Sequence, residues 1–162
     1  MEATTEPRWL TDDEQVVWRS FTQLQGQLAA ALNRQLQTTS ELSTADFGVL
    51  VHLSDAPAGR ERAFVLARAL QWEKSRLSHH LSRMERRGLI TRTECPTDAR
   101  GAFVVLSSAG RSALERAAPG HVTEVRRLIF DALTPEQVAA LGTMCEVILG
   151  QLADVASCCD GV

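Results

Sequence analysis

The 162-residue sequence contains no run of roughly 18 or more apolar residues, the length that predicts a membrane-spanning helix. Its opening stretch, MEATTEPRWLTDDE, also lacks the basic leader and the apolar core of a secretion signal. We therefore expect a cytoplasmic protein with no membrane partner. A chain of this length, 44% hydrophobic, has enough residues for one compact core and too few to favour several domains.

Cysteine is scarce, and its spacing excludes the common roles of clustered thiols. No pair has the C-x-x-C spacing of a zinc knuckle, and the density is far below that of a disulfide scaffold. The adjacent histidines His79 and His80 diverge by about 100° around a helix, so they are poorly placed to bind one ion together. We expect no metal site. The cysteines are Cys95, Cys145, Cys158 and Cys159.

Sequence motifs of common enzyme sites are missing as well. The chain contains no G-x-S-x-G nucleophile elbow, no G-x-x-x-x-G-K phosphate loop and no H-E-x-x-H zinc motif. The histidines and serines at 78–82 fall on the convex surface of a predicted helix, where they cannot surround a substrate. We expect no enzyme and no cofactor.

The positive charge is concentrated in one segment of an acidic chain. Residues 60–101 contain ten Lys or Arg and five Asp or Glu, a net charge of +5 in a chain whose formal net charge is -3. The rest of the chain therefore carries -8. A basic segment within an acidic body is typical of a nucleic-acid-binding module. A solvated helix face is the alternative that charge alone leaves open.

Apolar spacing within this segment predicts which way the charges point. In a helix over 73–87, Leu77, Leu81, Met84 and the junction residue Leu89 form one stripe that can dock on a core. The outward set then contains no carboxylate, whereas an ordinary surface helix mixes both signs. Such a face is typical of one that binds phosphates and base edges. The outward set is Lys74, Ser75, Arg76, Ser78, His79, His80, Ser82, Arg83 and Arg86.

The flanking segments predict a winged helix around this helix. Residues 63–70 form a short helix that offers Phe64, Leu66, Ala67 and Leu70 to the core, and a tight turn at 71–72 completes a helix-turn-helix. Gly88 ends the second helix in the left-handed conformation. Residues 89–94 and 102–107 then predict two strands around a polar tip. We expect a mainly α fold with a small β-hairpin wing.

These segments resemble a known family. The wing DARGAFVVLSSAG, residues 98–110, is similar to the Asp-x-Arg and Leu-Thr-x-x-Gly pattern of the MarR family of bacterial transcription regulators, and SRLSHHLSRMERRGLI looks like its recognition helix. The resemblance covers about residues 18–152, with a departure at Ser107-Ser108. It implies a triangular homodimer, a wing Arg100 in the minor groove with Asp98 orienting that arginine or its neighbour, and an aromatic or phenolic effector.

The helices on either side of the winged helix carry long apolar stripes. Thr11 and Glu14 form a capping box before a helix over about 12–37, and Ser43 with Asp46 forms another before a shorter helix. Thr134, Pro135 and Gln137 mark the start of a last helix, after one that runs from Ser107 toward 133. The stripes are Trp18, Phe21, Leu24, Leu28, Ala31 and Leu32 in the first helix, and Val138, Leu141, Met144, Cys145, Ile148, Leu149 and Leu152 in the last.

These stripes predict a dimer, with an intrachain helical bundle as the alternative. We assign 12–38 and 108–155 to dimerisation and 43–107 to DNA binding, within a single domain spanning 1–162. A two-fold dimer places its recognition helices about one turn of DNA apart, so the operator should be a palindrome, an inverted repeat with roughly 10 bp between half-site centres.

Each candidate contact has an expected role. Arg76 and Arg83 are expected at guanine edges and Lys74 at a phosphate, with Ser75, Ser78, His79 and His80 at bases or phosphates. Backbone positioning or plain solvation is expected for the other basic residues, namely Arg60, Arg62, Arg86, Arg87 and Arg92.

Two kinds of trigger are open for regulation. A small ligand is expected at Trp18, Phe21, Phe47 and His52, for which ordinary core packing is the alternative. Oxidation of Cys95 beside the cationic wing is a rival trigger. The most favoured function is a ligand-responsive repressor of transcription, and a winged-helix protein-interaction adaptor without specific DNA binding is the competing one.

Overall fold

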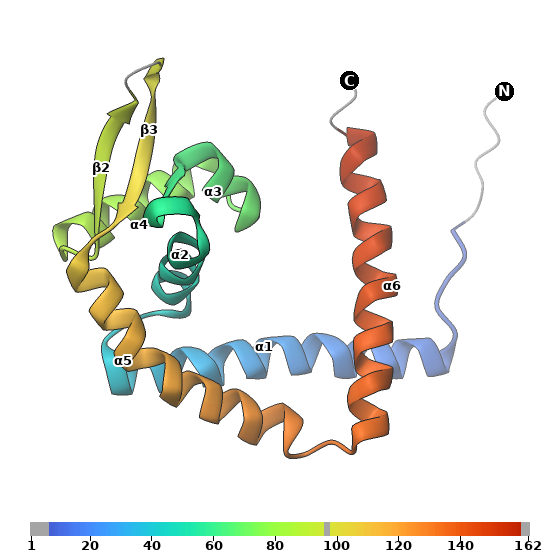
Figure 1. The fold of residues 1–162 in the computed structure, drawn as a ribbon. Helices are drawn as coiled ribbons and strands as arrows, with labels where there is room; N and C mark the ends of the chain where they lie inside the picture. The colour runs from blue at the N-terminus through green and yellow to red at the C-terminus, as the bar shows by residue number, and fades with distance from the viewer. Residues whose placement is uncertain (1–6, 96–97, 160–162) are drawn as a thin grey trace, which may run out of the picture. The chain divides into compact units, whose positions relative to one another are not determined.

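The computed structural model describes residues 7–95 and 98–159, with only the backbone described at 94, 95, 98–101 and 155–159. The chain divides into two compact units, one ending at His121 and the other beginning at Val122. Figure 1 shows the elements in chain order. They are α1 (Asp12–Ser40), α2 (Thr44–Asp55), η1 (Pro57–Gly59), β1 (Arg60–Arg62), α3 (Ala63–Ala69), α4 (Lys74–Arg86), β2 (Ile90–Cys95), β3 (Asp98–Leu106), α5 (Ser108–Val125), η2 (Arg126–Phe130) and α6 (Pro135–Cys159).

Local capping bonds fix where the helices begin. The N–H of Thr11 donates to Glu14 Oε2 at 2.8 Å, and the N–H of Glu14 donates back to Thr11 Oγ1 at 3.3 Å. Ser43 and Asp46 exchange the same pair of bonds at 2.9 and 3.0 Å at the start of α2. Such caps satisfy backbone donors that the first helical turn leaves unpaired, and each stabilises a helix by about 1 kcal/mol. Both predicted capping boxes are confirmed.

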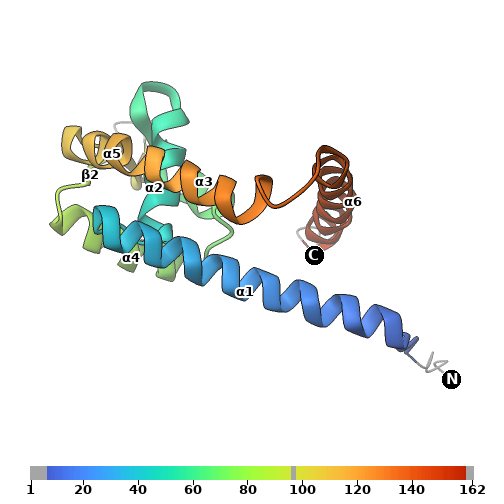
Figure 2. The same cartoon turned by 90° about the horizontal axis from the view of Figure 1, so that it is seen from below.

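One hydrophobic core holds the winged helix together. It is made of apolar residues from the end of α1 and the turn after it, from α2 and from α3, together with the inner stripe of α4, one residue from each long strand and three residues of α5. Figures 1 and 2 show α2 beside the C-terminal end of α1, whose N-terminal half extends away from the winged helix. The fully buried members are Leu36, Leu42, Val49, Leu50, Leu53, Leu66, Met84, Ile90 and Val104.

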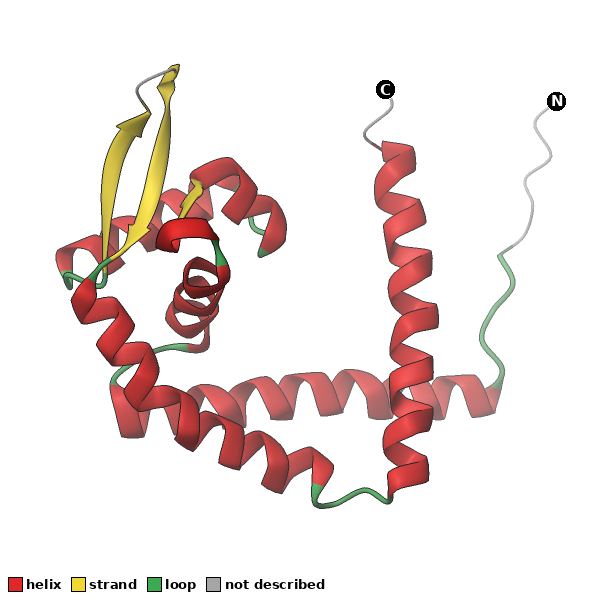
Figure 3. Cartoon of the chain, viewed as in Figure 1, coloured by secondary structure: helices red, strands yellow, loops and turns green. Residues whose placement is uncertain are grey.

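The sheet has three strands rather than the two of the predicted hairpin. Its order is β1-β3-β2 and all pairs are antiparallel, with Arg60 opposite Val105 and Ile90 opposite Leu106. Figure 3 shows β2 and β3 as a long ribbon beside the short β1. The guanidinium groups of Arg60 and Arg62 lie 5.1 and 5.3 Å from the ring centroid of Phe103. These cation–π contacts secure an edge strand that carries no apolar residue.

The prediction that Phe64 packs in the core is wrong. Its side chain is 65% exposed, because the inward face of the seven-residue α3 is formed by residues spaced i, i+3, i+4 and i+7. Phe64 stands about 100° away from that face. The inward residues are Ala63, Leu66, Ala67 and Leu70.

The second unit begins within the last turn of α5 and contains α6. The helix that was expected to run from Ser107 toward 133 passes Pro119, ends as an α-helix at Val125 and closes with the π-helical turn η2. The N–H of Thr134 donates to Gln137 Oε1 at 2.9 Å and the N–H of Gln137 donates to Thr134 Oγ1 at 3.3 Å, which confirms the predicted start of α6. In the part of the chain that the structure describes, no helix is long and apolar enough to cross a membrane.

Candidate nucleic-acid interface

The turn between α3 and α4 sets the direction of the candidate recognition helix. Gln71 adopts the left-handed conformation at φ 54°, and the N–H of Trp72 donates to Ala67 O at 2.9 Å. Leu77, Leu81 and Met84 are buried, so α4 is docked by this stripe and offers most of its other residues to solvent. The predicted helix-turn-helix and the predicted inner stripe are confirmed.

Most of the predicted outward residues of α4 are exposed. On this helix, seven of the side chains expected to contact DNA are exposed to solvent. Ser82 is half-buried, and its hydroxyl donates a hydrogen bond to Ser78 O at 2.9 Å. The exposed seven are Lys74, Ser75, Arg76, Ser78, His79, Arg83 and Arg86. This face carries donors and positive charge, which suits phosphate and base-edge recognition.

His80 does not belong to the outward set, so its predicted exposure on the DNA side is wrong. Its side chain is buried at 7% exposure, with Nε2 lying 3.1 Å from Asp46 Oδ1 on α2. The two atoms are close, but the contact does not have the geometry of a hydrogen bond. The edge of Trp72 meets the same imidazole with ring centroids 5.1 Å apart. His80 lies at the edge of the apolar stripe, and its side chain therefore points toward the core, where it contacts the carboxylate of Asp46.

Asp46 is the buried anion at the centre of this contact. Burial raises the cost of its charge, but the close contact with His80 and hydrogen bonds from the backbone N–H of Ser43, from Arg87 and from the Ser43 side chain outweigh that cost. Together they hold the pKa of the Asp46 carboxyl well below its ordinary value of 3.8. Arg87 Nη1 donates to Asp46 Oδ2 at 2.8 Å, and Nη2 donates to Glu41 O at the end of α1 at 2.7 Å. One side chain thus joins α1, α2 and α4.

Arg87 and Arg92 therefore bind within the protein, although both were expected to contact DNA backbone or solvent. Arg92 Nη2 donates to Ser78 O at 3.1 Å and to Ser82 Oγ at 3.0 Å, and its Nε lies 3.5 Å from Glu85 Oε2. Glu85 is itself exposed on α4, so the helix surface is not free of carboxylates as predicted. Its charge is balanced by Arg92, because the two side chains are in contact.

Two exposed arginines of α4 each contact an aromatic ring of the protein. The guanidinium of Arg76 lies 4.6 Å from the ring centroid of Trp72, a cation–π contact. Arg83 Nη2 lies 2.9 Å from His80 Nδ1, one helical turn away. These are the two residues predicted to reach guanine, and the structure brings the rings beneath them into contact with each other.

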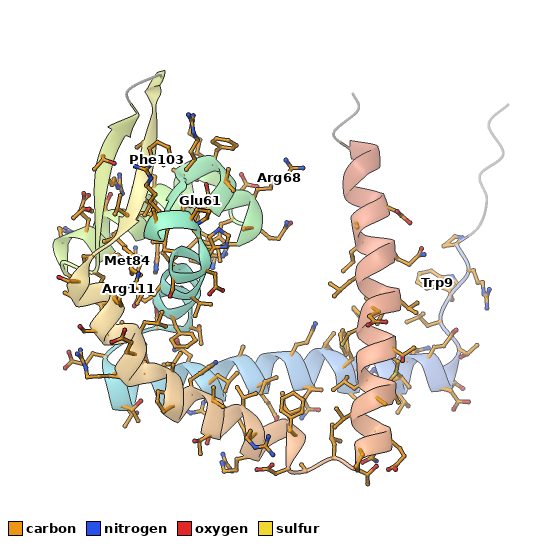
Figure 4. The ribbon with its side chains drawn as sticks, in the orientation of Figure 1. Trp9, Glu61, Arg68, Met84, Phe103 and Arg111 are labelled. Atoms are coloured by element: carbon orange, nitrogen blue, oxygen red, sulfur yellow. The ribbon has the colours of Figure 1, made fainter. Side chains whose placement is uncertain are left out.

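The ribbon of β2 and β3 forms the predicted wing beside this helix. The strands pair from Ile90 opposite Leu106 to Cys95 opposite Asp98, with an irregularity in register between Glu94 and Cys95. Figure 4 labels Phe103 on β3 near Glu61 of β1, where the ribbon joins the winged helix. The side chains of Asp98, Arg100 and Cys95, for which roles were predicted, lie outside the described residues.

The four predicted ligand residues are not brought together. Trp18 and Phe21 pair on α1 with ring centroids 6.2 Å apart, and Phe47 pairs with His121 at 4.5 Å. Burial lowers the pKa of His121. Among the described residues, His121 Nδ1 and Gln35 Oε1 are buried without a hydrogen-bond partner, and Gln35 lies beside Gly120. His52 is half-buried on α2.

A groove that the sequence did not predict lies between α3, α4 and the sheet. Its volume is about 520 Å³, and it is open to solvent. The exposed Phe64 explains part of it, since a large apolar ring left out of the core forms one wall. The lining includes Phe64, Arg68, Trp72, Ser78, Arg92 and Val104.

Sequence reasoning missed the roles of Asp46 and Trp72, which contact His80 and Arg76 of α4. Asp46 was interpreted only as a capping residue and Trp72 only as part of a turn. Arg76, His80, Arg83 and Arg87 follow one another at i, i+4, i+7 and i+11 along α4 and its C-cap, and Trp72 stands four residues before Arg76 in the turn. This second stripe of helical spacing was the available signal, because residues so spaced share one face.

Comparisons with known proteins agree with this architecture. A family model described as the MarR family matches residues 40–101. Sco3205, a MarR family transcriptional regulator from Streptomyces coelicolor solved in complex with DNA, is 42% identical over 92% of this chain and 93% of that chain, with a TM-score of 0.87. AbsC, a MarR family transcriptional regulator from the same organism, is 38% identical over 91% of this chain and 99% of that chain, with a TM-score of 0.85.

A third solved structure shares the fold at lower identity. It is the organohalide-sensing regulator RdhR-CbdbA1625 in its 2,4-dichlorophenol-bound form, which is 22% identical with a TM-score of 0.75. The match covers 93% of this chain and 89% of that chain.

Proposed function

Because the chain belongs to the MarR family of transcriptional regulators, we propose that it is a homodimeric repressor that binds an inverted-repeat operator and responds to a small ligand. The exposed face of α4 carries the proposal, because seven polar or cationic side chains face outward there while the opposite stripe is buried in the core. The likeness to Sco3205, which was solved with DNA, supports it.

Residues of α4 would divide the work of DNA recognition. Arg76 and Arg83 would reach guanine edges in the major groove, where a bidentate arginine is the commonest specific contact. Lys74 and Arg86, at the two ends of the helix, would bind phosphates. The exposed Ser75, Ser78 and His79 would donate to bases or phosphates.

The wing would add a second contact in the adjacent minor groove. We assign Arg100 to insertion there and Asp98 to orienting it, as the resemblance to the family implies. The support in this chain is the β2–β3 ribbon, which runs past residue 100 beside α4.

The apolar surfaces of both units support the homodimer. In the first unit, Val17, Trp18 and Leu24 are exposed along α1, and in the second unit Met144, Ile148 and Leu152 are exposed along α6. Apolar residues in such continuous stripes are costly in water, and a second copy of the chain can bury them. We therefore retain 12–38 and 108–155 as the dimerisation helices and 43–107 as the DNA-binding region.

We place the effector beside Phe47, among the four predicted residues. His121 Nδ1, on the residue that contacts this ring, and Gln35 Oε1, beside Gly120, are buried without a partner, so an aromatic ligand with a hydroxyl group would find both stacking and hydrogen bonds. The regulator of known structure that binds 2,4-dichlorophenol supports a phenolic class of ligand. The groove lined by Phe64 is a second candidate, because a ligand there would lie directly against α4.

A gel-shift titration against DNA adjoining the gene of this protein tests the proposal. Saturable retardation that persists over scrambled competitor, followed by a footprint with two symmetric halves, is the result expected of a dimeric regulator. Uniform weak binding that disappears at moderate salt would instead favour the winged-helix adaptor. Transcription from the footprinted promoter then distinguishes repression from activation.

A further inference from the structure

The contact between Arg83 and His80 assigns a role to each ring nitrogen of the imidazole. A guanidinium group has only donors, so the 2.9 Å contact of Arg83 Nη2 requires an acceptor at His80 Nδ1. The ring proton then lies on Nε2, which faces Asp46 Oδ1 at 3.1 Å. His80 therefore links a buried carboxylate on α2 to an exposed arginine on α4.

The imidazole cannot easily turn away from this arrangement. It is 7% exposed, with Asp46 at one nitrogen, Arg83 at the other and the edge of Trp72 against it at 83° between the ring planes. Arg87 holds the other oxygen of Asp46 at 2.8 Å, so the carboxylate is anchored as well. The acceptor that His80 offers to Arg83 is thus fixed by contacts with the core.

From this geometry we propose that His80 is a positioning residue for DNA recognition, which holds the guanidinium of Arg83 ready to bind guanine while Asp46 holds the ring. The proposal rests on the proposed function, because it takes Arg83 as a base-reading residue. The contact with His80 uses one of the five N–H donors of Arg83, and the exposed side chain keeps the others for a base. An arginine ordered before binding loses less side-chain entropy on the DNA.

The competing explanation is that His80 only satisfies Asp46 and stabilises the fold. Two substitutions separate the two nitrogen atoms. An asparagine side chain ends about where Nδ1 lies, so His80→Asn retains an acceptor for Arg83 and does not reach Asp46. A glutamine side chain reaches about as far as Nε2, so His80→Gln retains a donor for Asp46 and offers nothing to Arg83.

The experiment first obtains a DNA probe from the full-length protein itself. A duplex that wild-type protein selects from a random pool is labelled, and each guanine in turn is replaced by adenine symmetrically in both half-sites. The position at which Arg83→Ala no longer discriminates guanine from adenine identifies the guanine that Arg83 reads. Discrimination at that position is then measured for both His80 variants, and the free energy of unfolding is measured for each protein.

We expect His80→Gln to lose discrimination by about tenfold at that guanine, approaching Arg83→Ala, while its stability stays near that of wild type. We expect His80→Asn to be less stable and to keep its discrimination. The double variant His80→Gln/Arg83→Ala should discriminate no worse than Arg83→Ala alone, because His80 acts through Arg83.

Three results overturn the proposal, and they are distinguishable. If His80→Gln discriminates like wild type, or if discrimination follows stability in both variants, His80 is structural and the regulator itself stands. If Arg83→Ala still discriminates at every guanine, Arg83 is not a base reader and His80 has no reader to position. If wild-type protein enriches no sequence from the pool, the proposed function fails together with this inference.

Discussion

The carbonyl oxygen of Leu89 occupies the space that a Cβ on Gly110 would need. Gly110 lies in the first turn of α5, and an added Cβ would overlap that oxygen and come within 3.0 Å of Leu106 Cδ1. Ser107 brings the same segments together, since its hydroxyl donates to Gly88 O at 2.6 Å and accepts from the N–H of Gly110 at 2.9 Å. The glycine in the sequence SSAG thus permits α5 to start directly against the end of α4.

Replacing Gly110 by alanine should destabilise the protein by about 2 kcal/mol or more, because the obstacle is backbone and cannot change its rotamer. Urea unfolding followed by circular dichroism, at one fixed protein concentration, measures the change. Gly26→Ala is the matched control, since a Cβ there meets nothing within 4 Å in the middle of α1. That control should be neutral or stabilised by up to about 1 kcal/mol. Equal effects at the two positions would contradict the close approach at Leu89.

Asp46 should make stability depend on acid pH. Its pKa is lower in the folded protein than its ordinary value of 3.8, so the stabilisation that its charge provides is complete above that value and is lost as the pH falls through the folded pKa. Asp46→Asn should therefore be less stable than wild type by about 2 to 3 kcal/mol at pH 7. The difference should shrink as the pH is lowered below about 4.

Urea unfolding of both proteins from pH 7 down to acid pH checks this dependence. Asp55→Asn is the control, because Asp55 is exposed at the other end of the same helix. It should unfold at nearly the same urea concentration as wild type. A stability gap between wild type and Asp46→Asn that stays constant at every pH would show that the charge of Asp46 is not what stabilises the fold.

The parts of the fold that depend on near neighbours in sequence were predictable. The capping bonds join residues that are only three positions apart, namely Thr11 with Glu14 and Thr134 with Gln137. The nearby sequence alone therefore determines where each of these helices begins. The stripe of Leu77, Leu81 and Met84 likewise follows from helical spacing alone. These features determined the helix-turn-helix and its orientation on the core.

Features that depend on distant partners were not predictable. The strand β1 has the sequence Arg-Glu-Arg, with no alternation of apolar and polar residues. It forms because β3 pairs with it and because its two arginines make cation–π contacts with Phe103. His80 looks like an outward residue until α2 brings Asp46 against it. Phe64 lies on a helix of seven residues, too short for spacing to decide which apolar side chain turns inward.

Arg100→Ala should weaken binding to the operator by about 1 to 3 kcal/mol, because the wing would lose its minor-groove contact. The dimer should be unaffected, since the substitution lies at the wing. Fluorescence anisotropy with the footprinted duplex measures the affinity, and sedimentation measures the oligomeric state. Arg126→Ala is the control for loss of one positive charge, as Arg126 pairs with Asp131 at 2.9 Å in the other unit. Unchanged affinity in Arg100→Ala would remove the wing from the interface.

The apolar face of α6 provides the test of the dimer. Leu141 and Ile148 are 37% and 48% exposed and lie two helical turns apart on one face, so a glutamate at each would place two charges in the proposed interface. The double variant Leu141→Glu/Ile148→Glu should sediment as a monomer and bind the operator poorly, because one half-site alone gives too little binding energy. Thr143→Glu adds a charge on the opposite face of the same helix and should remain dimeric. If the double variant stays dimeric, α6 is not the interface, whereas a monomer that still binds the full operator tightly would mean that dimerisation is unnecessary for recognition.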